Sequence, residues 1–292
     1  MICIYHSKDL DGYTSGAIVK RKYPDAKLIG YDYGQPLEIE ATGEPIIMVD
    51  VSVPMATMLK LAQMSNFQFT WIDHHVSAIN DYKQFTEGKE SFCVAILEDG
   101  ISACEGAWKY LFPNEEMPEA VELLGEYDTW RNGNKIRWEN HVLPFQFGMR
   151  QICNSPETFP DYLLEKKNTR FGQDVLNVIR DGKLILSYQA MINESQCKRA
   201  AFESTLGGLR AICLNGGGLG SDTFKSVYDE TKHDLMIPFQ FNGKFWTVSL
   251  YTTKDEVDCS AIAKSMGGGG HKKAAGFQVS DIATVFTAIK TA

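Results

Sequence analysis

The strongest constraint on the fold comes from short apolar runs that end in an acidic or imidazole side chain. The clearest is Thr70-Trp71-Ile72-Asp73-His74-His75, in which the run ends in a carboxylate and two imidazoles. The same pattern places His6 after the run from Ile2 to Tyr5, and Asp50 after the run from Ile46 to Val49. Because these runs are short and nearly continuously apolar, we expect them to be strands buried on both faces of a sheet.

Helical signals separate these strands. We expect Thr14 or Ser15 to cap a helix that reaches Tyr23, and Val53-Pro54 to open a second helix that ends at Asn66. Further strands are expected at 27–31 and 67–72. This alternation predicts an α/β fold with a parallel sheet covered by helices on both faces. Since the carboxyl ends of such strands form the ligand crevice, the residues that follow them should meet at one edge of the sheet.

The pattern changes in the second half of the chain. Helices are expected at 102–112 and 118–127, the second of which delivers Asp128, and one or two more at 171–199 with Gly182 as the break. After Gly207-Gly208, strands are expected at 209–214, 234–241 and 245–251, with Asn242-Gly243 as a two-residue hairpin turn. We therefore expect two domains with a cleft between them: a parallel-sheet domain over 1–170 and a smaller mixed-sheet α/β domain over 205–292, joined by a helical connector over 171–204.

Composition narrows the class of protein. The 292 residues are 44% hydrophobic and 11% aromatic, which is typical of a globular protein and argues against disorder. The formal net charge of -8 argues against a protein that coats long nucleic acid electrostatically. The seven cysteines contain no C-x-x-C pair, so neither a disulfide framework nor a thiolate zinc site is indicated. Without a recognisable signal peptide or a bilayer-spanning run, we expect a cytoplasmic protein.

The segment from His6 to Gly12 contains three candidate metal ligands. Asp9 and Asp11 can both reach inward only if the backbone curls, which suits a loop wrapped around metal; a solvated turn is the alternative. The complete set of candidates is His6, Asp9, Asp11, Asp50, Asp73, His74, His75 and Asp128. Oxygen and nitrogen ligands without thiolates suit manganese, magnesium or iron. Because the candidates exceed the need of one metal, we expect two ions bridged by one carboxylate, an arrangement that hydrolyses phosphate esters.

A second cluster follows a helix expected at 260–265. Its four consecutive glycines let backbone N–H groups approach an anion, and the basic residues that follow add donors and positive charge. The alternative is a flexible helix end with a solvated basic turn, but a purely structural stop needs only one glycine. We therefore expect an anion site formed by Gly268, Gly269, Gly270, His271 and Lys272.

An aromatic segment runs from Trp130-Arg131 to Arg137-Trp138. Its rings are of the kind that stacks on nucleobases. The alternative, which the sequence favours, is that these rings cap a core at the edge of a domain.

The order of the metal-ligand motifs resembles that of the DHH phosphoesterases, a family named for the triplet found here as Asp73-His74-His75. Four amino-terminal motifs match in order, and they are His6 with Asp9-Leu10-Asp11-Gly12, Val49-Asp50, Asp73-His74-His75 and Tyr127-Asp128. In addition, Gly267 to His271 with Ala274-Ala275-Gly276 resemble the motif of the DHH-associated C-terminal domain. The resemblance spans nearly the whole chain.

This resemblance implies a role for each matched residue. Of the metal ligands, His6 and Asp9 would hold one ion, Asp11, His74 and Asp128 the other, and Asp50 would bridge the two. The catalytic assignments are His75, which would approach the scissile phosphate, and Asp73, which would orient neighbouring ligands. The C-terminal domain would close over the cleft, with Gly269, Gly270 and His271 grasping a nucleotide phosphate.

One departure from the family pattern bears on the substrate. Many relatives carry an Arg in a Ser-Leu-Arg-Ser segment upstream of the glycine cluster, whereas here Ser249-Leu250 is followed by Tyr251-Thr252-Thr253-Lys254. We include Lys254 among the expected substrate contacts, although a Lys cannot grip phosphate bidentately as an Arg does.

The family includes RecJ exonuclease, oligoribonucleases that degrade very short RNA and pAp, cyclic-dinucleotide phosphodiesterases and exopolyphosphatase-like proteins. In size and domain order the chain resembles the short-oligonucleotide group. We expect a hydrolase with two manganese ions, or magnesium, that acts on short RNA or DNA oligonucleotides or on nucleotides such as pAp. The alternatives are a polyphosphate or pyrophosphate hydrolase, a cyclic-dinucleotide phosphodiesterase and a non-catalytic nucleotide-binding module. No membrane partner is expected, and a homodimer stays open.

Overall fold

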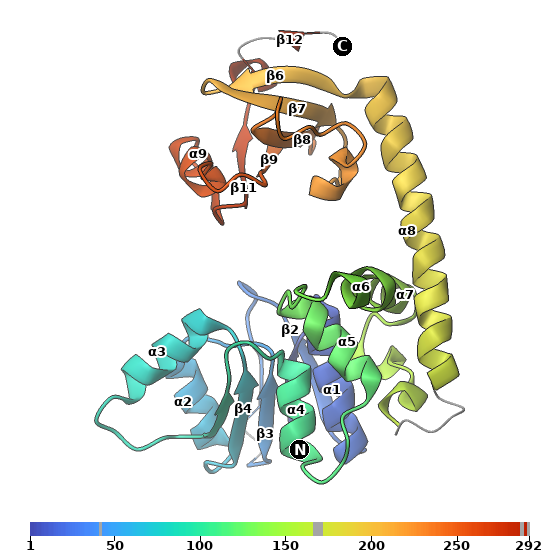
Figure 1. Cartoon of the computed structure of the whole chain (residues 1–292). Coiled ribbons are helices and arrows are strands. Elements are labelled where there is room, and N and C mark those ends of the chain that lie inside the picture. The colour runs from blue at the N-terminus through green and yellow to red at the C-terminus, as the bar shows by residue number, and fades with distance from the viewer. Residues whose placement is uncertain (41–42, 166–171, 287–288, 291–292) are drawn as a thin grey trace. The chain divides into compact units, whose positions relative to one another are not determined.

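The computed structural model describes residues 1–40, 43–165, 172–286 and 289–290 (Figure 1). The chain divides into two compact units, Met1–Leu186 and Ser187–Ala292, which we call the first and second units. The domain boundaries expected after residues 170 and 204 stay predictions, and the first of them lies outside the described residues. None of the helices in the described part of the chain has both the length and the apolar character needed to cross a membrane.

A parallel sheet forms the centre of the first unit. In spatial order its five strands are β2 (Lys27–Tyr31), β1 (Ile2–His6), β3 (Ile46–Val49), β4 (Phe69–Asp73) and β5 (Val94–Leu97). Every neighbouring pair is parallel. The expected α/β fold with a parallel sheet is confirmed, and β5 is a strand that the sequence pattern does not single out.

Helices cover both faces of this sheet (Figure 1). On one face, a buried apolar cluster draws residues from α1 (Leu10–Lys22), α4 (Ala103–Leu111), α5 (Glu119–Asp128) and α7 (Leu143–Ile152). On the other face, a second cluster draws residues from α2 (Met55–Met64) and α3 (Val76–Thr86). Trp71 of β4 packs in the second cluster and the next residue, Ile72, in the first. Because alternate side chains pack on opposite faces of the sheet, most positions of such a strand are apolar.

Helix α1 begins earlier than the sequence suggests, so the expected cap at Thr14 or Ser15 is wrong. The N-cap is Asp9, whose Oδ1 accepts a hydrogen bond from the Gly12 N–H at 2.9 Å. Thr14 and Ser15 are buried inside the helix, where the Thr14 hydroxyl donates to the Leu10 carbonyl. The backbone curl that was expected in a metal-wrapping loop is therefore the first turn of a helix.

Strand β4 begins at Phe69, two residues after the expected start. Asn66 and Phe67 have positive φ angles of 53° and 61°, and the Phe67 N–H donates to the Ala62 carbonyl at 2.6 Å. These residues therefore belong to the C-terminal turn of α2 and not to the strand.

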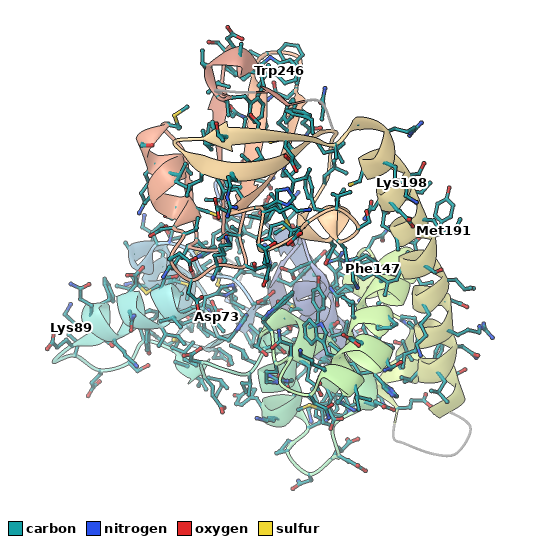
Figure 2. The ribbon with its side chains drawn as sticks, turned by 45° about the horizontal axis from the view of Figure 1, so that its top comes forward. Asp73, Lys89, Phe147, Met191, Lys198 and Trp246 are labelled. Carbon is teal, nitrogen blue, oxygen red and sulfur yellow. The ribbon has the colours of Figure 1, made fainter. Side chains whose placement is uncertain are left out.

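Helix α8 (Gly172–Ala200) is one continuous helix in which Gly182 is not a break. A Cβ at Gly182 would overlap the Pro144 carbonyl oxygen, so this glycine allows α8 to pack closely against α7. Leu184, Tyr188 and Met191 are exposed, and Met191 points away from the helix (Figure 2). The shorter elements of the first unit are α6 (Lys135–Arg137), the π-helix η1 (Trp138–Val142), and the 3-10 turns η2 (Pro156–Thr158) and η3 (Asp161–Leu164).

The second unit contains a mixed sheet, as expected for the second domain. In spatial order its strands are β10 (Gly269–Gly270), β11 (Ala274–Val279), β9 (Trp246–Tyr251), β8 (Leu235–Phe241), β7 (Leu209–Asn215), β6 (Phe202–Leu206) and β12 (Ile289–Lys290). Only β7 and β8 pair in parallel among the described strands of this sheet. The helical elements are α9 (Cys259–Ser265), η4 (Ser221–Phe224) and η5 (Ile282–Thr284).

The turn between β8 and β9 is longer than the expected two residues. It spans 242–245, because Phe241 pairs with Trp246 and the Asn242 N–H donates to the Phe245 carbonyl. The Asn242 side chain also accepts hydrogen bonds from the N–H groups of Lys244 and Phe245. These side-chain bonds hold the four-residue loop, so the two-residue turn is wrong.

Candidate metal centre

The candidate ligands gather at the carboxyl edge of the first unit's sheet. His6 ends β1, Asp50 directly follows β3, and Asp73 ends β4. Strands β1 and β3 are neighbours, and the strand order reverses at this pair. Ligand sites in open α/β sheets form at such a reversal, outside the carboxyl ends of the strands.

Three groups of possible ligand atoms occur among the described residues. One consists of Asp50, Asp73, His74 and His75, and the other two lie on either side of Asp50. In the first of these two, His6 Nδ1 lies 2.9 Å from Asp9 Oδ2 and 3.5 Å from Asp50 Oδ2. In the second, His74 Nε2 lies 3.2 Å from Asp128 Oδ2 and 3.7 Å from Asp11 Oδ2.

Asp50 connects the two groups. Its Oδ2 faces His6 at 3.5 Å, and its Oδ1 faces His74 Nε2 at 3.5 Å. Asp50 is buried and has a φ angle of 60°, a left-handed conformation that is uncommon outside glycine. Such strain persists where the surrounding structure imposes it, and here it aims both carboxylate oxygens into the cluster.

The N-terminus of helix α4 holds the carboxylate of Asp11. The N–H groups of Ala103 and Cys104 donate to its two oxygens at 2.9 and 2.8 Å. Ser102 and Glu105 form a capping box at this terminus. The N–H groups and the dipole of a helix N-terminus favour a carboxylate, so α4 fixes the position of Asp11 beside His74.

Arg131 continues this support. Its guanidinium donates to both oxygens of Glu105, at 3.0 and 2.8 Å. A Cβ at Gly125 would lie 2.5 Å from the Glu105 carboxylate, so only glycine fits beside it on α5. The ion pair of Arg131 and Glu105 thus joins the segment after Asp128 to helix α4, whose N-terminus binds Asp11.

Asp73 orients the turn that carries the two histidines. Its Oδ1 accepts hydrogen bonds from the N–H groups of His74 and His75, at 2.7 and 3.1 Å. The same oxygen lies 2.7 Å from His75 Nδ1. His75 Nδ1 therefore carries the proton that Asp73 accepts, and the partly exposed ring leaves Nε2 for another partner.

Where no metal is bound, the environment of the cluster favours the protonated forms of most of its side chains. Burial raises the pKa of Asp50 and of Asp128 to about 7, and burial together with the charge of Asp50 raises that of Asp11 to about 8. The neighbouring carboxylates of Asp50 and Asp9 raise the pKa of His6 to about 10, and the bond to Asp73 raises that of His75 to about 9. Burial opposes the ionisation of Asp9, but its bonds to His6 and the Gly12 N–H lower its pKa.

The residues present fit a pair of divalent cations. Nine buried side-chain atoms lack a well-formed hydrogen bond among the described residues, and five of them belong to the cluster: His6 Nδ1, Asp50 Oδ2, Asp73 Oδ2, His74 Nε2 and Asp128 Oδ2. Unsatisfied buried polar atoms are costly, and a bound ion is one way to satisfy them. Imidazole nitrogen and carboxylate oxygen suit manganese, magnesium or iron.

Sequence reasoning missed Asp32 and Tyr33. Asp32 follows β2 and lies 3.9 Å from His6 Nε2 and 3.5 Å from Lys8 Nζ. The Tyr33 ring lies 5.7 Å from the His6 ring. The signal for Asp32 was present, because it follows a strand just as Asp50 does.

The glycine cluster of the second unit has several structural roles. Gly267 has a φ angle of 79° after α9, and Gly270 has one of 140°. A Cβ at Gly268 would overlap the Gly276 carbonyl, and one at Gly270 would meet Ala275 at 2.6 Å. Gly269 alone among Gly267 to Gly270 has neither a positive φ nor a close neighbour. The expectation that a structural role would need only one glycine after this helix is therefore wrong.

The side chains expected to bind an anion in the second unit differ in their exposure and in their pairing with carboxylates. His271 and Lys272 are exposed. Lys254, in contrast, is largely buried and its Nζ lies 2.5 Å from Asp234 Oδ1. Arg210 binds the same carboxylate at 3.0 Å. The anion role of Lys254 stays a prediction, and this pairing would have to open for it to act.

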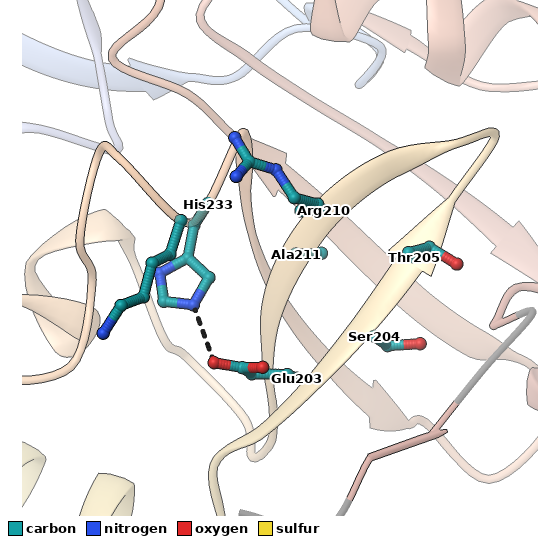
Figure 3. Close-up of a pocket in the computed structure, with 7 residues that line it drawn as sticks. Glu203, Ser204, Thr205, Arg210, Ala211 and His233 are labelled. Carbon is teal, nitrogen blue, oxygen red and sulfur yellow. Dashed lines mark ion pairs between the residues drawn. The ribbon is translucent and has the colours of Figure 1, made fainter.

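The second unit also contains a pocket of about 280 Å³ (Figure 3). His233 Nδ1 accepts the Asp229 N–H at 3.0 Å, so its proton lies on Nε2, which faces Glu203 at 3.5 Å. The cations of the pocket already pair with carboxylates, Arg210 with Asp234 and Lys232 with Asp229. We therefore assign no ligand to it.

Comparisons with known proteins support the assignment of the fold. No family model matches the chain. It is 28% identical over 250 residues to the uncharacterized protein R106 of Acanthamoeba polyphaga mimivirus, which covers 81% of this chain and 53% of that protein. The chain thus spans about half the length of this relative. It is 22% identical over 314 residues to oligoribonuclease NrnB of Bacillus subtilis, covering 96% of this chain and 73% of NrnB.

Two solved structures share the fold over most of the chain. The pGpG-specific phosphodiesterase PggH from Vibrio cholerae is 11% identical with a TM-score of 0.52, covering 96% of this chain and 93% of PggH. The DHH domain of a member of the s1p family of ribosomal proteins is 14% identical with a TM-score of 0.54, covering 94% of this chain and 81% of that one. At these identities the similarity concerns the fold alone.

Proposed function

We propose that this chain is a metal-dependent phosphoesterase of the DHH superfamily that hydrolyses phosphoester bonds of short oligonucleotides or nucleotides. The observation that carries the proposal is the position of Asp50, whose two oxygens face two separate groups of nitrogen and oxygen ligands. One carboxylate between two such groups is suited to bridge a pair of divalent ions, as two-metal phosphoesterases require.

In this proposal the candidate ligands form two metal sites that share Asp50. His6, Asp9 and Asp50 would hold one ion, and Asp11, His74, Asp128 and Asp50 the other. When bound, two divalent ions lower the pKa of a coordinated water and neutralise charge on the phosphoryl oxygens. Manganese is the proposed metal, and magnesium the alternative.

His75 would contribute positive charge beside the phosphate. The bond to Asp73 raises the pKa of His75 to about 9, so the ring is cationic near neutral pH. Its Nε2 is free to donate to a phosphoryl oxygen as negative charge develops there. Asp73 would fix the tautomer and direction of this ring without binding metal itself.

The relatives support the substrate class. NrnB is an oligoribonuclease and PggH a phosphodiesterase specific for pGpG. In the second unit, the exposed His271 and Lys272 and the unobstructed Gly269 support a contact with a terminal phosphate, together with Gly268, Gly270 and, if released from Asp234, Lys254. A cytoplasmic location and a homodimer stay predictions.

The decisive variant is Asp50→Asn. Asparagine has the shape of aspartate and tolerates a positive φ, so the fold should persist, but a neutral amide cannot bridge two cations. We expect manganese-dependent hydrolysis of an RNA dinucleotide to fall to the limit of detection, with an unchanged circular dichroism spectrum. Asp81→Asn, an exposed change on α3, is the matched control and should retain full activity. Retained manganese-dependent turnover in Asp50→Asn would contradict the bridging assignment.

A further inference from the structure

Trp130 has a left-handed backbone conformation, which at the end of a helix is normally adopted by glycine. Helix α5 ends at Asp128, and Trp130 follows with a φ angle of 54°. The Trp130 N–H donates to the Tyr127 carbonyl at 3.1 Å, and the Arg131 N–H to the Glu126 carbonyl at 2.9 Å. This pair of bonds is the Schellman motif, in which the left-handed residue is usually glycine. A bulky residue here is strained, and such strain often marks a functional site.

The side chain of Trp130 does not offset this strain by burial, because it is 62% exposed. Tyr127 and Trp138 stack in parallel with centroids 5.8 Å apart and pack against the apolar core. Trp130 leans on this stack, 4.9 Å from the Trp138 ring and inclined by 67° to it. The core cap that the sequence favours is thus formed by Tyr127 and Trp138, and Trp130 lies outside it.

The backbone of Trp130 lies close to the candidate metal centre. Trp130 follows the candidate ligand Asp128 by two residues, so their Cα atoms are at most about 7 Å apart. The next residue, Arg131, is held by both oxygens of Glu105, which caps the helix that binds Asp11. Asp128 before Trp130 and Arg131 after it both contact other elements, so the backbone that carries the Trp130 ring is held on both sides.

A cation accompanies the aromatic stack. The exposed Arg150 guanidinium lies 5.6 Å from the Tyr127 ring and 5.0 Å from the Phe147 ring. Arg150 thus contacts Tyr127, the ring 6.1 Å from Trp130, and no cation–ring contact between Arg150 and Trp130 occurs among the described residues. Aromatic rings and cations on one surface are the combination that binds single-stranded nucleic acid, since a base stacks on a ring and a phosphate attracts a cation.

We propose that Trp130 is the stacking platform for a nucleobase of the substrate, next to the phosphate that is hydrolysed. This inference rests on the proposed function and adds to it a residue that binds the base. Stacking tolerates any base, so the platform favours nucleotides over phosphoesters without a base, and not one base over another.

The test compares substrates with and without bases in the full-length protein with manganese. The substrates are an RNA dinucleotide and the same phosphodiester with abasic ribose at both positions. In Trp130→Asn, where Asn tolerates the positive φ, kcat/KM for the dinucleotide should fall by about 5- to 150-fold, mostly through KM. The value for the abasic compound should change by less than about twofold. Trp130→Phe should keep most of the activity, because Phe can still stack.

Phe67 provides a matched control. It is also aromatic, 61% exposed and left-handed after a helix, with a φ angle of 61°, but it precedes β4 at the other end of the strand from the metal centre. Both Asn variants should relieve strain and keep or raise the melting temperature, and only Trp130→Asn should lose activity on the dinucleotide.

The possible outcomes separate this inference from the proposed function. An equal loss on both substrates, or no loss on either, would overturn the stacking role while leaving hydrolysis intact. If the wild-type protein hydrolyses neither substrate, the proposed function fails, and equilibrium binding of AMP and ribose 5-phosphate then decides the role of Trp130. AMP binding that weakens in Trp130→Asn, with ribose 5-phosphate binding unchanged, supports the platform; equal affinities of the variant and the wild type for AMP overturn it.

Discussion

Gly12 determines how closely helix α1 approaches the end of β1. A Cβ at this position would overlap the carbonyl oxygen of His6. The helix must lie this close for Asp9 on its N-cap and Asp11 in its first turn to reach the same cluster as His6. Glycine is therefore needed at this position for packing, and not for a turn.

Gly12→Ala should damage both stability and activity. The added methyl group forces α1 away from β1, which costs about 1–3 kcal/mol as overpacking and separates Asp9 and Asp11 from His6. We expect a lower denaturant midpoint in urea unfolding and a loss of manganese affinity by calorimetry. Gly133→Ala is the matched control, because a Cβ there meets no atom within 4 Å. Equal manganese affinity in the two variants would show that Gly12 does not position the ligands.

Some residues of the candidate metal centre and its surroundings can be predicted from the sequence and others cannot, for physical reasons. Asp50 and Asp73 could be located because one follows and the other ends a short, mostly apolar strand. Asp32 obeys the same rule, but β2 lies at the edge of the sheet and is partly exposed, so its end is less conspicuous. The left-handed backbone of Trp130 could not be read from the sequence, because it depends on how α5 ends.

At the scale of secondary structure, helix α4 positions a ligand from far along the chain. Its terminal amides bind Asp11, which lies 92 residues before Ala103. The Ser102-x-x-Glu105 spacing of the capping box is visible in the sequence. Its partner is not, because the contact forms only when α1 and α4 pack on the same face of the sheet.

Ser102→Ala should weaken this support. Loss of an N-cap side chain costs about 0.5–2 kcal/mol, and fraying of the first turn would release the N–H groups that hold Asp11. We expect a lower melting temperature and weaker manganese binding. Asp258→Ala removes the N-cap of α9 in the second unit, where the side chain accepts the Ala261 N–H at 3.0 Å. This control should lose comparable stability but bind manganese normally, and parallel losses of metal binding in both variants would contradict the role of α4.

At the scale of the whole molecule, pH should act oppositely on the metal-free and metal-bound protein. The pKa values of Asp50 and Asp128 are raised to about 7, and that of Asp11 to about 8. Those of His6 and His75 are raised to about 10 and 9. A raised pKa in the folded state contributes stability that is present below the unfolded pKa and is lost as pH rises through the folded one. The three carboxylates therefore lower the stability of the metal-free protein as pH rises from about 4 to about 7 or 8, and the two histidines lower it as pH rises from about 6.5 to about 9 or 10.

Manganese binding should reverse this trend. Metal ligands must be deprotonated, so affinity should rise with pH through about 7 to 8, and binding should release protons. At 100 times the dissociation constant, the metal adds about 2.7 kcal/mol of stability. We expect the increase in melting temperature caused by a fixed manganese concentration to be larger at pH 8 than at pH 6. A shift that is constant or shrinks over this range would contradict the assigned ligand set.

The central claim is that the cluster around Asp50 hydrolyses phosphoester bonds of short nucleotides. The most direct measurement is product analysis of the purified protein with manganese on an RNA dinucleotide, a longer RNA, pAp, a cyclic dinucleotide and polyphosphate. The account predicts that mononucleotides appear fastest from the dinucleotide, or AMP from pAp, and that chelation abolishes the reaction. Phosphate released from polyphosphate alone, or no product from any of the five, would contradict it.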